Sequence, residues 1–196
     1  MDSSPHRFFR DGVFTSTDLP AVRVRVDPAF EYLGSHQFEI YEAAQVERHI
    51  FVDAQDGSIQ RLLIFQFEGY LSDNDYAYQW GVTNPIDLGG QTYHHNTYCY
   101  NNNEVIQQQP GSEPDHTTRI LREKGYTLED ELMMSRFARI VGDDQRHELI
   151  IFYIENVNST GHTLQEISEE GAIVEKYGDL SEALTRRALE SFEVLE

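Results

Sequence analysis

Cysteine and lysine are nearly missing from this chain of 196 residues, which contains one cysteine, Cys99, and two lysines, Lys124 and Lys176. A single cysteine excludes a disulfide within the chain and is typical of a reducing compartment. The first residues, MDSSPHRFFRDG, contain neither a basic nor an apolar segment, so the sequence predicts no secretion signal. We therefore expect a cytoplasmic protein.

Long apolar runs are also missing, because no segment approaches the roughly 20 apolar residues of a membrane-spanning helix. Positive charge is scarce as well: 34 Asp and Glu residues outnumber 15 Lys and Arg residues, for a formal net charge of −19. Such an acidic surface repels phosphate backbones and anionic lipids. The composition therefore disfavours nucleic-acid and membrane partners, and it leaves a small-molecule ligand and a homodimer as the partners to consider.

Two apolar stretches organise the sequence, and they resemble each other. Residues 62–69, LLIFQFEG, align without a gap with residues 149–156, LIIFYIEN. Both are short, rich in Ile, Leu and Phe, and bounded by turn residues, which predicts strands rather than helices. The alignment makes Glu68 equivalent to Glu155. An internal duplication would explain the similarity, and so would the composition that any two core strands share.

Each predicted core strand follows a predicted hairpin partner, at residues 45–54 and 132–141. The sequence is therefore interpreted as one domain, 1–196, with two similar halves at about 36–100 and 126–196. The polar stretch between the halves, residues 101–114 (NNNEVIQQQPGSEP), is predicted to be a flexible surface loop.

Helices are expected in three places. Residues 115–124 end at a glycine, Thr163 to Glu166 forms a capping-box sequence, and residues 179–192 repeat apolar side chains at helical spacing. Strands outnumber helices and form hairpins, which predicts an α+β fold: an antiparallel meander sheet with the C-terminal helix packed on it. The alternative is a closed β-barrel with flanking helices.

Aromatic residues are concentrated in two segments, 76–82 and 91–100, which are predicted to be neighbouring strands. The set consists of Tyr76, Tyr78, Trp80, Tyr93, Tyr98 and Tyr100. Tyrosine and tryptophan can line a ligand pocket while keeping a polar group available, and they are equally suited to a subunit interface or to the rim of a core. These residues are the candidate ligand-binding residues.

Two other groups of residues could support chemistry. Glu68 and Glu155 would share one cavity if a pseudo-twofold axis relates the halves, and a close carboxylate pair, aided by His94 or His95, could provide acid and base. The alternative is that each glutamate meets solvent or pairs with an arginine.

His95 and Cys99 fall on one side of their predicted strand, and His116 could supply a third metal ligand. No spacing matches a known metal or cofactor motif, and ordinary polar strand residues are the favoured interpretation, so we expect no cofactor.

The leading hypothesis is a protein that binds a small, partly apolar ligand in an aromatic-lined pocket without catalysis. One rival is an enzyme that uses the carboxylates and histidines in the same cavity. The other rival is an interaction or oligomerisation protein whose aromatic strands contact a partner.

Overall fold

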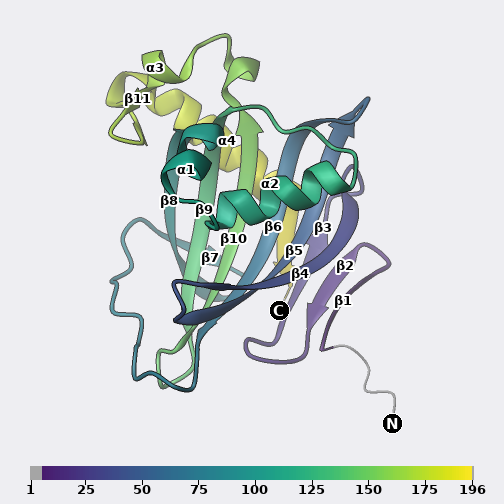
Figure 1. Cartoon of the computed structure of the whole chain (residues 1–196), viewed down its shortest axis with the longest axis vertical. Helices are drawn as coiled ribbons and strands as arrows, with labels where there is room; N and C mark the ends of the chain where they lie inside the picture. The colour runs from purple at the N-terminus through teal and green to yellow at the C-terminus, as the bar shows by residue number, and fades with distance from the viewer. Residues whose placement is uncertain (1–5, 196) are drawn as a thin grey trace.

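The computed structural model describes residues 6–195, which form two main antiparallel sheets, a third sheet of two short strands, and several helices (Figure 1). The smaller sheet has the order β1-β2-β3-β13, with β1 (Arg7–Arg10), β2 (Val13–Ser16), β3 (Val22–Val26) and β13 (Phe192–Leu195). The larger sheet has the order β4-β5-β6-β10-β9-β8-β7, with β4 (Glu31–Ile40), β5 (Ala44–Gln55), β6 (Ser58–Tyr70), β7 (Pro85–Leu88), β8 (Gln91–Asn101), β9 (Glu131–Val141) and β10 (His147–Asn156).

The helices are α1 (Asn102–Gln108), α2 (Glu113–Glu123), α3 (Leu164–Ile167) and α4 (Gly178–Ser191). Two 3₁₀ turns (Val157–Thr160 and Glu175–Tyr177) and a short hairpin of β11 (Ser168–Glu169) and β12 (Ala172–Ile173) complete the described chain. The predicted antiparallel sheet with a C-terminal helix is confirmed. Within residues 6–195 both main sheets are open, with β4 and β7 at the edges of the larger one, so the barrel alternative is wrong.

The larger sheet is buried on both faces, which gives the molecule three layers (Figure 1). One face packs against the smaller sheet and α4, with Phe65, Phe137 and Leu184 in the shared core. The other face is covered by α2, where Ile64 and Leu121 belong to a second core. Strands buried on both faces need apolar residues at nearly every position, and this explains the continuous apolar runs of β6 and β10.

The two similar apolar stretches are neighbours at the centre of the larger sheet. β6 and β10 pair in antiparallel register from Leu62 opposite Ile154 to Glu68 opposite Glu148. Phe65 therefore faces the smaller sheet, while Phe152 belongs to the core beneath α2, although the sequence alignment made them equivalent. Because both faces of each strand are apolar, the hydrophobic pattern alone does not determine which residues of β6 and which of β10 lie on the same face of the sheet.

Two local expectations from the sequence are wrong. Residues 71–84 connect β6 to β7 without forming a strand, so the aromatic residues at 76–80 lie on a loop. The stretch 101–114 is not a flexible loop, because it contains α1 and the start of α2. Asn101 begins α1 by accepting a hydrogen bond from the Glu104 backbone N–H, a local capping interaction that the polar composition obscured.

The edge strand β4 bends across the front of the sheet, below α2 in the view of Figure 1. Its register with β5 shifts between Tyr32 and Gly34, and Gly34 has φ of +111°. A β-bulge of this kind bends a strand, and only glycine takes this φ readily. The bend brings the end of β4 towards the helices that cover the sheet.

Among the described helices, none is long and apolar enough to cross a membrane.

Helix α2 is held on the sheet by a narrow apolar stripe, in which Leu121 is 1% exposed. Replacing Leu121 with alanine should lower the free energy of unfolding by about 2–4 kcal/mol, because it leaves a cavity between helix and sheet. Arg122→Ala, at an exposed position of the same helix, is the matched control and should change stability by less than about 0.5 kcal/mol. Urea unfolding measures both, and equal losses would show that α2 does not pack as described.

Candidate ligand-binding site

A cavity of about 560 Å³ lies between the covered face of the larger sheet and the helices α1 and α2. Strands β4, β5, β6, β8, β9 and β10 contribute to it, together with both helices. Its lining includes Ile40, Tyr41, Arg48, Leu62, Ile64, Glu68, Tyr98, Tyr100, Asn102, Val105, Glu113, Pro114, Thr117, Thr118, Leu128, Met134, Arg136, Glu148, Ile150, Phe152 and Ile154.

The floor of the cavity changes from apolar to acidic along the two central strands. In β10, Ile154, Phe152 and Ile150 line the cavity at alternate positions, and Glu148 follows with the same spacing. Side chains at alternate positions of a strand share a face, so this apolar row ends at a carboxylate. In β6, Leu62 and Ile64 line the cavity, the buried Gln66 follows on the same face, and Glu68 ends the row directly opposite Glu148.

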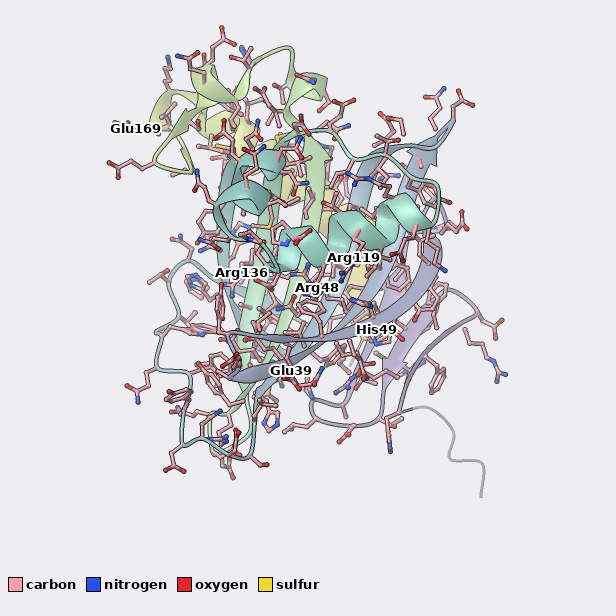
Figure 2. The ribbon with its side chains drawn as sticks, in the orientation of Figure 1. Glu39, Arg48, His49, Arg119, Arg136 and Glu169 are labelled. Atoms are coloured by element: carbon pink, nitrogen blue, oxygen red, sulfur yellow. The ribbon has the colours of Figure 1, made fainter. Side chains whose placement is uncertain are left out.

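Arg48 fastens the helical cover to the sheet. Its side chain rises from β5 and is buried, with the whole residue 5% exposed. The guanidinium donates hydrogen bonds to Gln66 Oε1 on β6 (2.6 Å), to Thr117 Oγ1 on α2 (2.5 Å), and to the Glu113 backbone carbonyl (3.0 Å) and Oε1 (2.8 Å). Figure 2 shows Arg48 just below α2, and Arg136 lines the same cavity from β9.

The acidic end of the cavity is a pair of glutamates on adjacent strands. Glu68 lies directly opposite Glu148 in the β6–β10 register, a relation that places Cβ atoms roughly 4.5–5.5 Å apart. Tyr78 Oη and Gln66 Nε2 donate hydrogen bonds to Glu68 at 2.7 and 2.8 Å. The Trp80 indole N–H donates to Glu148 Oε1.

Arg136 is the only cationic group paired with these two glutamates among the described ion pairs. Its Nη2 lies 3.9 Å from Glu148 Oε2, which is an ion pair without a hydrogen bond. Arg48, the other arginine of the cavity, is committed to Glu113, Gln66 and Thr117. One cationic side chain therefore faces two carboxyl groups, so their negative charges are only partly compensated when both are ionised.

Both glutamates hold their protons more tightly than an exposed carboxyl does. Burial raises the pKa of Glu148 to about 7, the negative charges of Glu68 and Glu113 add to the rise, and Trp80 and Arg136 oppose it. Burial also raises the pKa of Glu68, against the hydrogen bonds from Tyr78 and Gln66. Glu148 therefore changes its protonation state near neutral pH, as groups in binding or catalytic sites often do.

The six candidate aromatic residues are divided between several environments. Tyr98 and Tyr100 line the cavity, and Tyr78 and Trp80 hold its glutamates from the loop 71–84. Tyr76 lies on the same loop and is 58% exposed.

The sixth residue, Tyr93, is fully buried in the core between the two sheets, on the opposite face of the larger sheet. The structure therefore brings four of the six to the cavity or its acidic end.

Glu155 does not meet Glu68. It lies on the face turned to the smaller sheet and α4, where Tyr153 Oη donates to it and Arg187 binds it with two hydrogen bonds of 2.6 and 2.8 Å. The expected carboxylate pair is thus replaced by Glu68 and Glu148. Glu148 could have been found from the alternation of residues 148–154, if this strand had been aligned in antiparallel direction with residues 62–68. The ungapped alignment ran both strands in the same direction and therefore paired Glu68 with Glu155.

The candidate histidines are not part of the cavity wall. His94 Nδ1 accepts a hydrogen bond from the Thr83 backbone N–H, its Nε2 lies 3.1 Å from Asn96 Nδ2, and its ring packs beside Trp80 at the edge of the acidic end. His95 points to the other face, where it contacts Ser135 and stacks on Phe137. Burial lowers the pKa of His95, so its imidazole is neutral at physiological pH.

The three candidate metal ligands are not brought together. The side chains of His95 and Cys99 belong to the face of β8 that packs in the core between the two sheets, although Cys99 also borders the cavity, whereas His116 lies on α2 and stacks on Phe38. Within the described part of the chain, no group of three or more His, Cys, Asp or Glu side chains is arranged to hold a metal ion.

Comparison with known protein families, curated proteins and solved structures found no match to this chain. Any functional conclusion therefore depends on the cavity and its chemistry.

The raised pKa of Glu148 predicts a specific pH dependence of stability. A carboxyl with a higher pKa in the folded protein favours folding when protonated, so the free energy of unfolding falls as the pH rises from about 4.5 through about 7. Glu148→Gln keeps an acceptor for Trp80 and removes this titration. Between pH 5 and 8 the free energy of unfolding of the unmodified protein should fall by on the order of 1–3 kcal/mol more than that of the variant. Urea unfolding at each pH measures this, and parallel profiles would contradict the assignment.

Proposed function

We propose that this protein binds a small, partly apolar molecule in the cavity between the larger sheet and α1 and α2. The observation that carries the proposal is the cavity itself: about 560 Å³, with an apolar floor and a few convergent polar groups at one end. Ligand sites in proteins typically enclose roughly 300–1,000 Å³ and combine apolar walls with a small number of orienting polar side chains.

Binding without catalysis is the simpler function for this site. None of the described residues lining the cavity is a histidine, and Arg48 is occupied in holding α2. The apolar walls formed by residues such as Ile150 and Phe152 suit retention of a ligand.

A second candidate function is general acid–base catalysis by Glu68 and Glu148. It is favoured by the opposed carboxyls and by the pKa of Glu148 near neutrality, where a group both gives and accepts protons efficiently. The two functions are separated by a Glu68→Gln, Glu148→Gln double variant. An enzyme would lose turnover of its ligand while still binding it, whereas a binding protein has no turnover to lose.

The test of the binding function uses a variant that fills the cavity. Val105 lines the cavity from α1 and is half-buried, so Val105→Trp should occupy the space and weaken binding of a neutral environment-sensitive dye, Nile red, at least tenfold. Fluorescence titration measures the affinity. Native mass spectrometry of the protein purified from its own host should show extra mass that is released on denaturation.

The matched control is Ile106→Trp, which adds the same side chain one position further along α1, at a half-buried residue that does not line the cavity. This variant should bind the dye with the affinity of the unmodified protein. Equal binding by all three proteins, or an apo mass together with no dye binding, would overturn the proposed function.

A further inference from the structure

We propose that the ligand of this cavity is an amphipathic cation, with a protonated amine bound between Glu68 and Glu148 and an apolar body along Ile150 and Phe152. This inference rests on the proposed binding function and adds the chemical class of the ligand. It follows from the charge balance of the residues that line the cavity, from the hydrogen bonding of Glu148, and from the position of the two glutamates at one end of the apolar floor.

The charges lining the cavity do not balance. Arg48 is paired with Glu113 at 2.8 Å, which leaves Glu68 and Glu148 with Arg136 as the remaining cation. When both glutamates are ionised, this end of the cavity carries an excess negative charge in a buried environment. Two like charges at directly opposite strand positions destabilise each other, so a cation between them would relieve the repulsion.

One carboxylate oxygen lacks a hydrogen-bond donor. Glu148 is 4% exposed, and its Oε1 accepts a hydrogen bond from Trp80, but its Oε2 accepts no hydrogen bond from residues 6–195. Arg136, at 3.9 Å, is too far away. Glu148 lines the cavity, so the unpartnered oxygen of this nearly buried side chain is available to a donor inside it. An ammonium group supplies three donors and no acceptor, which is the complement required.

An anionic headgroup is the chemical opposite, and the same geometry disfavours it. A carboxylate reaching for Arg136 would have to approach Glu148, which pairs with that arginine, and Glu68 beside it. The protein also carries a formal net charge of −19, which attracts cations to its surface and slows the approach of anions.

The test compares three probes with one alkyl chain and different headgroups: octylamine, octanol and octanoate. Calorimetric titrations at pH 8 keep the amine protonated, and this pH lies above the pKa of about 7 that Glu148 has in the folded protein. Octylamine should bind at least tenfold more tightly than octanol, and octanoate most weakly. Glu148→Gln should reduce the octylamine affinity to that of octanol and change octanol binding by less than about threefold.

The control variant is Glu39→Gln, which removes one negative charge from an exposed position of β4, next to the cavity-lining Ile40. It should leave octylamine binding unchanged, because its carboxylate lies on the outer face of the strand. If Glu39→Gln lowers the octylamine affinity as much as Glu148→Gln does, the preference for amines comes from net charge, and the inference is overturned.

Failure of this inference is distinguishable from failure of the proposed function. If all three probes bind equally well and Val105→Trp weakens all three, the cavity binds ligands but the amine assignment is wrong. Tighter binding of octanoate than of octylamine would also overturn the assignment. If none of the probes binds, the assignment fails, and the Nile red titration decides separately whether the cavity binds apolar molecules.

Discussion

The buried guanidinium of Arg48 is the interaction on which the site depends. A charge removed from water is tolerated only when it is paired and its donors are satisfied, and Arg48 meets both conditions by joining β5 to β6 through Gln66 and to α2 through Thr117 and Glu113. Loss of Glu113 would leave the buried guanidinium without its carboxylate partner. Arg48 thereby holds α2, and with it the roof of the cavity, over the sheet.

The sequence predicted the architecture correctly where a single feature, such as an apolar run or a helical spacing, determines the local structure. The apolar stretches at 62–69 and 149–156, their hairpin partners at 45–54 and 132–141, and the helical spacing of 179–192 predicted the antiparallel sheet and α4. The errors arose where two signals compete. Residues 76–82 alternate like a strand, but Tyr78 and Trp80 are held by hydrogen bonds to Glu68 and Glu148, which only tertiary structure reveals.

The site was predictable in part, for a related reason. Glu68 and the aromatic residues near it were chosen as candidates from composition and position, whereas Glu148 was not. An ungapped alignment assumes that equivalent strands run alike, yet β6 and β10 are adjacent and antiparallel, so the partner of Glu68 lies near the start of β10 and not at its end. Sequence periodicity gives the alternation within a strand but not the register between strands.

The central pairing of β6 with β10 also has a consequence for how the chain folds. The strands that form the middle of the larger sheet join position 62 to position 154, and β3 pairs with β13 through Val26 and Phe192. Contacts between such distant positions require large loops to close before much apolar surface is buried, and folding rates fall as such non-local contacts dominate. We therefore expect the cavity to be completed late in folding, after the β5–β6 and β9–β10 hairpins have met.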